Sequence, residues 1–368
     1  MGTCFSCRCR CRSTMINMSD EDESPGEQQD NVEYCRMNVT EEERSKAKAA
    51  GNSTRDLAKA TVLTLKYVQD RQLDALRVHL LSMEDFQGLV NWRNKNGCNI
   101  VYILSRDGEI EPLRTLLENV PEAAKFELMN SAEPERGTIS LHAAAENNRV
   151  ECLRLLLDHG VDVNVADGYG LTALHRTVNK GSGVSIVSEL LNCGADVLVT
   201  DKAGLTALHR ASMRGNLEAV RSILDHAKGK GVMRELVFLR ARKSRSFEPT
   251  AVHLATYSTN SERLIRMYIE EYGADVNMSG TDLQHSLLHA CAMMDNKAAD
   301  VRLLLEWGAN PNRLNSEGDT PLHLAVQFNQ LETCVELLRA KKCDHRIPNK
   351  DGLTALQVAF SSHKFALL

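Results

Sequence analysis

Apolar residues in this chain recur in short runs separated by polar turns. Adjacent leucines or their equivalents end an amphipathic segment, and a glycine follows a few residues later, in LLLDHGVDVN (155–164), LLNCGADVL (190–198), YIEEYGADVN (268–277) and LLLEWGANPN (303–312). A left-handed residue commonly ends a helix, and glycine adopts that conformation at low cost. The pattern therefore predicts helices that end near Gly160, Gly194, Gly273 and Gly308.

A second string recurs between these runs and gives the period. It reads GTISLHAAAENNR from Gly137, GLTALHRTVNKG from Gly170, GLTALHRASMRGN from Gly204 and GDTPLHLAVQFNQ from Gly318. The histidine marks the same phase at His142, His175, His209, His253, His289 and His323, in steps of 33, 34, 44, 36 and 34 residues. Self-similarity at such a period indicates a repeat array.

The two strings together resemble the ankyrin repeat. The resemblance lies in a turn with D-G or a relative, T-P-L-H at the start of a first helix, a second helix ending in L-L, and G-A-D-V-N before the next hairpin. It implies an all-α repeat solenoid, an ankyrin array of about seven to eight helix-turn-helix and β-hairpin units over residues 58–368.

Divergent segments lie at both ends of this array. NGCNIVYILSRDGEIEPLRTLLE keeps the register, with Tyr102 at the histidine position and Gly108 at the turn between its helices. TVLTLKYVQDRQLDALRVHLL from Thr61 keeps only the two-helix apolar spacing, and DGLTALQVAFSSHKFALL has Gln357 at the marker position. Terminal repeats are atypical because one face meets water, so we expect a degenerate cap and the start of a last unit.

The repeated residue types have structural roles in this architecture. The apolar pairs of the second helices are expected to pack between neighbouring units: Leu155, Leu156, Ile223, Leu224, Leu303, Leu304, Leu337 and Leu338. Thr172, Thr206 and Thr320 are expected to cap first helices. The marker histidines lie about 10 Å apart along a solenoid and cannot converge on one metal ion. The resemblance implies that each bonds neighbouring loop backbone.

The resemblance also implies a partner-binding groove made of hairpin tips and first helices. Positions one and four to five residues after the markers are expected to face it: Arg176, Asn179, Lys180, Arg210, Met213, Arg214, Leu254, Tyr257, Met293, Met294, Leu324, Gln327 and Phe328. The middle of this set is basic, and its C-terminal half is apolar with adaptable methionines. A peptide or domain with an acidic half and a hydrophobic half would complement it.

The step from His209 to His253 is ten residues longer than the step before it (44 against 34). The insert, near 227–247, is strongly basic and carries Lys228, Lys230, Arg234, Arg240, Arg242, Lys243 and Arg245. We expect it to extend the second helix or to bulge as a loop. Two interpretations stay open: a solvated basic loop, or a contact for acidic peptide, phosphoprotein or anionic lipid.

Composition narrows the classes of function. The net charge of -5 over 368 residues argues against a nucleic-acid binder that uses its whole surface. No stretch approaches the roughly 18 apolar residues of a membrane-spanning helix, and no secretory signal follows the first arginines. Seven of the eleven cysteines are scattered singly, as expected of reduced, buried thiols. Nucleotide-loop, metalloprotease, hydrolase and kinase motifs are absent, so neither an enzyme nor a cofactor is expected.

The first residues, MGTCFSCRCRCRS, predict a lipid anchor. M-G-T-C-F-S fits the signal for N-myristoylation of Gly2, and Cys4, Cys7, Cys9 and Cys11 offer sites for palmitate. A single myristoyl chain binds bilayers with K of only about 10⁴ M⁻¹, so a second signal is needed. The alternatives are an unmodified disordered tail and a metal clip; against the clip, C-x-x-C-x-C-x-C lacks a second separated cysteine pair. Residues 1–57 are then an anchor signal and a disordered tether rich in acids.

Two functions follow from these patterns. The first is a non-catalytic adaptor or scaffold, held at the cytoplasmic face of a plasma or endomembrane, whose array binds a protein partner. A start at Met15 or Met18 would remove the anchor and give a soluble cytoplasmic form. The second is a soluble inhibitor or regulatory subunit that resembles the inhibitor of NF-κB family and masks a partner in its groove.

Overall fold

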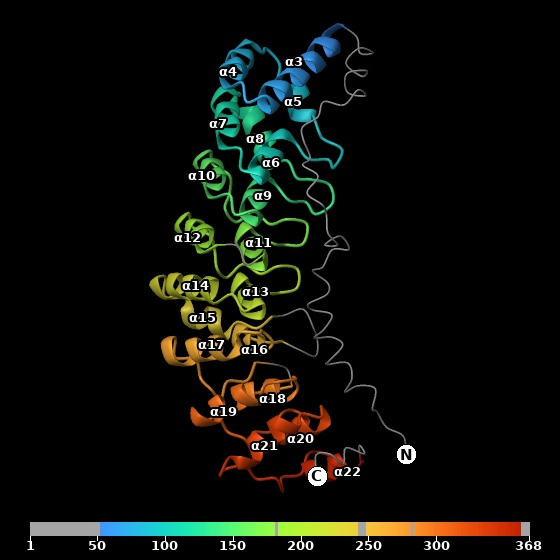
Figure 1. The fold of residues 1–368 in the computed structure, drawn as a ribbon, viewed down its shortest axis with the longest axis vertical. Coiled ribbons are helices and arrows are strands. Elements are labelled where there is room, and N and C mark those ends of the chain that lie inside the picture. The colour runs from blue at the N-terminus through green and yellow to red at the C-terminus, as the bar shows by residue number, and fades with distance from the viewer. Residues whose placement is uncertain (1–51, 181–182, 242–247, 281–282, 362–368) are drawn as a thin grey trace. The chain divides into compact units, whose positions relative to one another are not determined.

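The computed structural model describes residues 52–180, 183–241, 248–280 and 283–361, with side chains from Leu57 onward and without that of Lys180. Helices make up the regular structure of these ranges, apart from single antiparallel bridges at Thr200–Thr206 and Ser279–Ser286. The predicted all-α repeat fold is confirmed. The chain divides into two compact units, unit 1 up to Glu135 and unit 2 from Arg136 (Figure 1).

Unit 1 contains six described helices: α3 (Asn52–Gln69), α4 (Leu73–Ser82), α5 (Gln87–Asn91), α6 (Ile100–Asp107), α7 (Ile110–Asn119) and α8 (Glu122–Asn130). α3 and α4 are the pair expected from TVLTLKYVQDRQLDALRVHLL, and α3 runs across the predicted boundary between residues 57 and 58. α6 and α7 are the unit marked by Tyr102, with Asn99 capping α6 and Gly108 left-handed at φ 82°. α5 and α8 carry no repeat motif, and the sequence analysis did not predict them.

Unit 2 is a series of helix pairs. They are α9 (Ser140–Glu146) with α10 (Val150–Asp158), α11 (Ala173–Lys180) with α12 (Val184–Asn192), α13 (Ala207–Arg214) with α14 (Leu217–Gly229), α16 (Ala251–Ala255) with α17 (Ser261–Arg266), α18 (Leu287–Ala292) with α19 (Ala298–Glu306), and α20 (Pro321–Gln327) with α21 (Leu331–Arg339). α15 (Met233–Phe238) interrupts this order, the π-helical turn η1 (Met267–Glu271) extends α17, and α22 (Ala355–Ser361) is the last described helix. First helices follow one another in one column and second helices in a second column (Figure 1).

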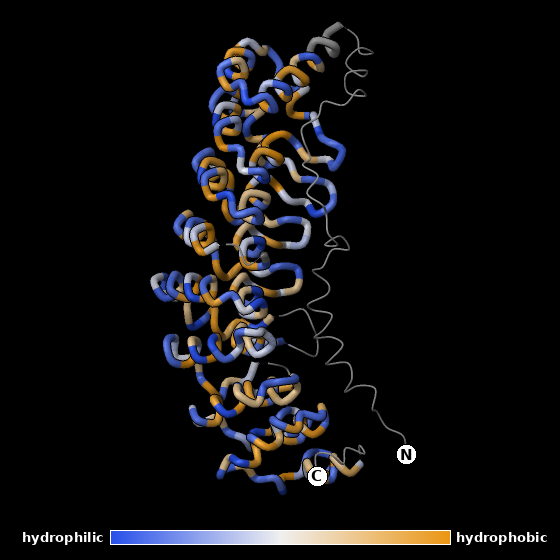
Figure 2. Tube along the Cα trace, viewed as in Figure 1, coloured by the Kyte–Doolittle hydropathy of each residue, from blue (hydrophilic) through white to orange (hydrophobic). Residues whose placement is uncertain are grey.

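The core of unit 2 lies between neighbouring pairs. Seven of the eight predicted core residues are buried: Leu155, Leu156, Ile223, Leu224, Leu303, Leu304 and Leu337. The prediction for Leu338 is wrong, because this side chain is 53% exposed. α21 packs on α19 and α20, and the described residues leave Leu338 uncovered. The helices carry hydrophobic and hydrophilic residues side by side, and several hairpin loops are mainly hydrophilic (Figure 2).

Glycines end the second helices as predicted. Gly160 and Gly308 have φ of 85° and 86°, a left-handed conformation that costs other residues free energy. At Gly160 the backbone N–H donates to the Leu157 carbonyl, and the next N–H donates to Leu156, which satisfies the last carbonyls of α10. At these two ends, a left-handed glycine therefore sets the path of the chain from the helix into the hairpin.

Candidate protein-binding surface

In unit 2, each marker histidine connects one repeat to the next. In the third helix pair, the Thr206 hydroxyl and backbone N–H bond the Nδ1 atom of His209 at 2.8 and 3.3 Å, while its Nε2 bonds the Leu239 carbonyl at 3.1 Å. In the last described pair of helices, His323 bonds Thr320 and the Leu353 carbonyl in the same way. Both ring nitrogens are thus used within the fold, and the predicted structural role is confirmed.

Burial keeps these rings neutral. It lowers the pKa of His175 and of His209 to about 4, because the imidazolium form would lose its hydration. The rings are therefore neither poised for acid–base chemistry near pH 7 nor available to a metal ion. At the marker position of the last unit, Gln357 uses its amide oxygen in place of the imidazole and accepts the Thr354 N–H at 2.8 Å.

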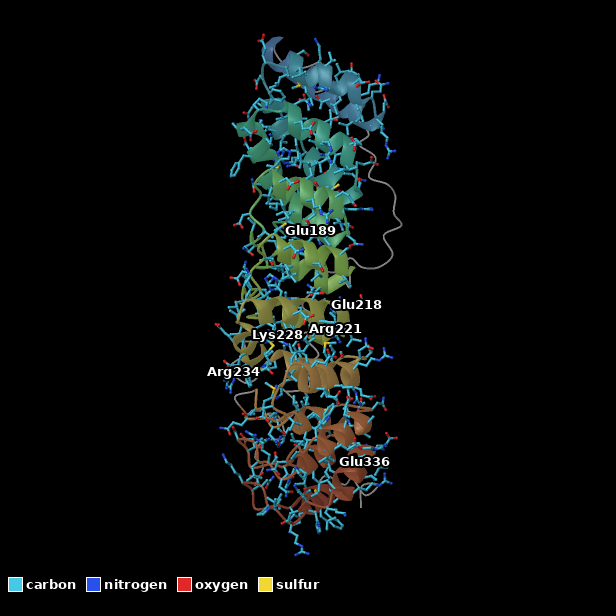
Figure 3. All side chains as sticks on the ribbon, turned by 90° about the vertical axis from the view of Figure 1, so that its left-hand side faces the viewer. Glu189, Glu218, Arg221, Lys228, Arg234 and Glu336 are labelled. Atoms are coloured by element: carbon cyan, nitrogen blue, oxygen red, sulfur yellow. The ribbon has the colours of Figure 1, made fainter. Side chains whose placement is uncertain are left out.

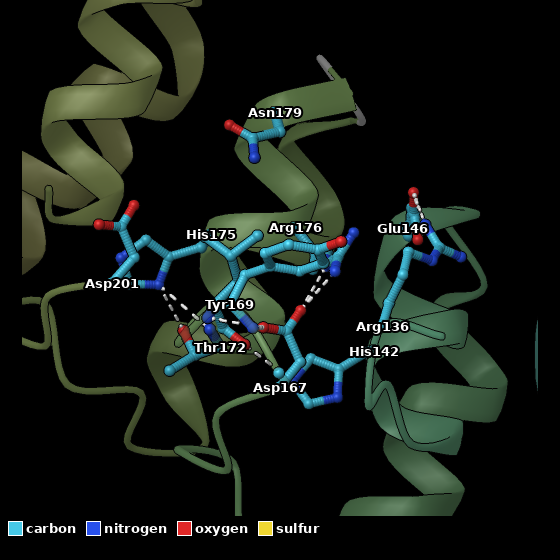
Figure 4. A network of polar contacts seen from close by, with 12 residues as sticks. Arg136, His142, Glu146, Asp167, Tyr169, Thr172, His175, Arg176, Asn179 and Asp201 are labelled. Atoms are coloured by element: carbon cyan, nitrogen blue, oxygen red, sulfur yellow. Dashed lines mark hydrogen bonds and ion pairs between the residues drawn. The ribbon is translucent and has the colours of Figure 1, made fainter. Parts of the chain in front are cut away.

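Two hairpin tips carry an additional polar lock, and Figure 4 shows the one formed by Asp167 and Arg176. The Asp167 carboxylate accepts the N–H groups of Tyr169 and Leu171 with Oδ1, at 2.8 and 2.9 Å. Its Oδ2 accepts Nε of Arg176 at 2.8 Å. Asp201 repeats the arrangement one unit later and accepts Nε of Arg210 at 2.6 Å. The side chain of one aspartate therefore holds both its own hairpin and the first helix that follows.

This lock corrects the predicted basic groove. Arg176 is 8% exposed and Arg210 is 4% exposed, so neither offers a free cation to a partner. A guanidinium beside a buried carboxylate is already neutralised and takes up the role of a hairpin brace. The spacing of nine residues between aspartate and arginine, present only in these two hairpin motifs, was the signal in the sequence that identifies the pair.

The other predicted groove positions separate into two groups. Leu254, Met293 and Leu324 are buried in the core. Asn179, Met213, Tyr257, Met294, Gln327 and Phe328 are half-buried, and Arg214 is exposed. The side chain of Lys180 lies outside the described part. We call Met213, Arg214, Tyr257, Met294 and Phe328 the inner-face set; it is mainly apolar and carries one free-standing cation rather than a basic stripe.

The basic insert extends a second helix, which is one of the two forms expected from the sequence. α14 has 13 residues against nine in α10, and α15 follows it after a short turn. Lys228, Lys230, Arg234 and Arg240 are exposed. Arg242, Lys243 and Arg245 lie outside the described residues, as do Gly2, Cys4, Cys7, Cys9 and Cys11 of the predicted anchor.

A pocket lies between the second helices α14 and α17. This pocket, of about 480 Å³, is lined by residues of α12, α14, α17 and η1: Val184, Leu217, Glu218, Arg221, Ser222, Arg263, Arg266, Met267 and Glu271. Arg221 closes one side by an ion pair with Glu271 (2.9 Å between Nη2 and Oε1), and Figure 3 shows it beside Glu218. The sequence analysis missed this pocket.

A buried polar cluster joins α17 to α19. The Lys297 ammonium donates to Oγ of Ser261 at 2.7 Å and to the Ser258 carbonyl at 3.0 Å, and it lies 3.4 Å from the Asp300 carboxylate. Ser261 in turn donates to Asp300 at 2.6 Å. All four residues are buried. Because the serine and lysine are buried, a substrate cannot reach them. The cluster therefore acts as a brace between neighbouring repeats.

No described helix has both the length and the apolar character that crossing a bilayer requires.

A family model for ankyrin repeats, three copies to each match, fits residues 67–167, 106–201, 141–234, 174–280, 252–347 and 288–368. The overlapping matches extend from residue 67 to the last residue and include the divergent unit marked by Tyr102.

Known proteins share this similarity over parts of their length. Ankyrin repeat protein FPV031 of fowlpox virus is 32% identical over 113 residues, which are 30% of this chain and 33% of that protein. The nuclear factor NF-kappa-B p105 subunit of Gallus gallus is 24% identical over 285 residues, 77% of this chain and 23% of that protein. The solved ankyrin repeat domain of human ASB11 is 23% identical with a TM-score of 0.47, over 60% of this chain and 90% of that one.

The chain thus spans a third or less of the two curated relatives. Since the family model matches most of its length, the chain belongs to the ankyrin-repeat family, whose arrays are protein-interaction modules.

Proposed function

We propose that this protein is a non-catalytic adaptor whose array binds a protein partner while N-terminal lipidation holds it at the cytoplasmic face of a membrane. The observation that carries the binding half is the inner-face set, because Met213, Tyr257, Met294 and Phe328 stay half-buried four or five residues after successive marker histidines. Partly exposed aromatic and methionine side chains in register are the kind of surface that an apolar peptide or helix buries.

The anchoring half rests on the sequence. Gly2 in a myristoylation signal, four cysteines and three arginines coincide in the first twelve residues. Each arginine near an anionic leaflet contributes about 1 kcal/mol, and a second acyl chain makes membrane binding stable. These signals supply the two components that stable anchoring needs.

The anchor is tested in cells with a fluorescent protein at the C-terminus. The parent chain, Gly2→Ala, and a variant with Cys4, Cys7, Cys9 and Cys11 changed to serine are compared by membrane fractionation. We expect the parent in the membrane fraction and both variants in the soluble fraction. Equal solubility of all three rejects the anchor.

The partner surface is tested by proximity labelling with Phe328→Ala, which removes a half-buried ring of the inner-face set. Phe126→Ala, in α8 of unit 1, is the matched control because its ring is 66% exposed and lies outside this set. Loss of labelled proteins with Phe328→Ala alone supports the surface, and equal loss with both variants rejects it.

The second candidate is a soluble inhibitor or regulatory subunit that masks a partner. The likeness to the p105 subunit, over 77% of this chain, favours it. The fractionation experiment separates the two candidates, because a soluble parent chain directs the search to cytosolic or nuclear partners.

A further inference from the structure

The described part of the basic insert, residues 227–241, forms a platform attached to the array. Leu236 and Val237 of α15 are buried and fix this helix on the array. His209 bonds the carbonyl of Leu239 just after α15, and the Ala241 N–H donates to the Pro249 carbonyl at 3.1 Å. A solvated loop needs no such attachment. The buried side chains and hydrogen bonds therefore hold α15 in one place on the array.

The platform presents exposed cations that have no acidic partner among the described residues. Lys228, Lys230 and Arg234 are exposed, and the described residues offer them no ion pair. Arg240 is also exposed, and among the described residues it donates to the Ser279 carbonyl, at 3.4 Å. Glu235 is the acid that lies among them in the sequence. In a chain with net charge -5, this concentrates positive charge at one place.

An exposed aromatic ring accompanies the cations. Phe238 is 44% exposed, and it lies four residues after Arg234 on α15, so both side chains share one face of this helix. Lys228 and Arg234 are seen in Figure 3 from the side of the second helices, on the level of α14 and α15. The inner-face set lies at or just after the C-terminal ends of the first helices, so the two surfaces can be occupied at the same time.

We infer that this patch, made of Lys228, Lys230, Arg234, Phe238 and Arg240, binds an anionic phospholipid surface. Cations that flank an exposed phenylalanine match the interface of a bilayer, where headgroups attract the charges and the ring enters the acyl boundary. A specific acidic peptide would need a groove, and the pocket between α14 and α17 is lined by none of these five residues. The contact does not depend on acylation and goes beyond the anchor proposed above.

The test uses the full chain made in bacteria with Gly2→Ala and with serine at the four early cysteines, so that acylation is excluded. Co-sedimentation is measured with phosphatidylcholine vesicles and with vesicles containing roughly one-third phosphatidylserine. The test variant is Lys228→Gln, Lys230→Gln, Arg234→Gln and Arg240→Gln. The matched control neutralises four exposed cations elsewhere: Lys341→Gln, Lys342→Gln, Arg346→Gln and Lys350→Gln.

We expect binding to the anionic vesicles only, weakened by added salt. One lost cation should reduce the affinity about fivefold, so the test variant should lose at least tenfold against the control. Phe238→Ser should lose about threefold at unchanged charge. We expect the fourfold test variant and Phe238→Ser to keep the circular dichroism and melting temperature of the parent chain, because the substituted side chains are not in the core.

Three outcomes overturn the inference: no difference between anionic and neutral vesicles, equal loss in test and control variants, or tighter retention of polyglutamate than of anionic vesicles. The last outcome assigns the patch to an acidic protein segment. Since the three arginines of the first twelve residues are common to all variants, their own attraction cancels in the comparison. A negative result leaves the acyl anchor untouched, because that anchor is tested separately in cells.

Discussion

Two parts of unit 2 solve the same packing problem in different ways. From α9 to α13 the repeats are regular, and aspartate–arginine locks hold successive hairpins (Asp167 with Arg176, Asp201 with Arg210). From α14 to α19 the period is broken by the insert and by the π-helical turn η1, and no such lock is present among the described residues. Buried polar groups of other kinds take over there. The comparison shows that a repeat can lack the aspartate–arginine lock when other buried polar groups stabilise its contact with the neighbouring repeat.

His285 is the clearest example of this replacement. It stands four residues before the marker His289, where Leu171 and Leu205 stand in the regular repeats. The ring is 3% exposed, stacks on His289 with 5.5 Å between centroids, and accepts the Asn315 amide N–H at 3.1 Å. A polar ring therefore occupies an apolar site in the irregular region.

The largest effect is expected from Lys297→Met in the irregular region. The change leaves the Asp300 carboxylate buried with Ser261 as its remaining partner in the cluster. Loss of one partner of a buried ion pair typically costs about 3 kcal/mol or more. Urea unfolding should show this as a lower midpoint, with Lys341→Met as the exposed control. A loss below about 1 kcal/mol would show that the cluster is no brace.

Arg210→Met breaks the lock in the regular region. Asp201 keeps its bonds to the hairpin N–H groups, so we expect a smaller loss of about 2 kcal/mol in the free energy of unfolding. A double-mutant cycle with Asp201→Asn measures the coupling between the two side chains. Strictly additive effects would contradict the lock. A partner's affinity for the array should be unchanged, because Arg210 is buried.

His285→Leu restores the apolar residue of the regular repeats. Burial lowers the pKa of His285 to about 4 from 6.5, so between these values the unfolded chain takes up the proton and the folded chain does not. Stability is therefore lost as the pH falls, and the substitution removes this loss. We expect little change at pH 7, where Asn315 loses its acceptor, and a relative gain of about 2 kcal/mol at pH 5.

Thermal unfolding at the two pH values measures this effect, with the exposed His345→Leu as control. A gain that is equal at pH 7 and pH 5 would show that proton uptake by the unfolded chain is not its cause.

The smallest effect compares two glycines at the ends of second helices. Gly160→Ala places a side chain at φ 85°, with no atom within 4 Å of the new Cβ, so backbone strain alone should cost about 1 kcal/mol. Gly229 ends α14 in the insert and is not left-handed, and its Cβ also meets nothing within 4 Å. Gly229→Ala should be neutral or slightly stabilising by thermal melting. Equal losses would contradict this explanation.

The sequence alone predicted the repeat, its period and most of its core. Period and phase follow from requirements that every repeat shares: a capping residue, a marker side chain, two apolar residues and a left-handed glycine recur at fixed spacing. The same information predicted the extended α14 as one of two forms. It did not predict α5 and α8, because their segments carry no repeat motif and their formation depends on packing within unit 1.

The tertiary structure decided which of the positions that recur from repeat to repeat lie on the surface and which lie in the core. Phase places Arg176 and Arg210 on the groove, but each turns to an aspartate nine residues earlier and becomes buried. Phase also places Leu338 in the core, yet it is exposed because no described residue covers it. The Lys297 cluster joins residues up to 39 positions apart. Exposure and polar partnership depend on neighbouring units, so a pattern read within one repeat cannot determine them.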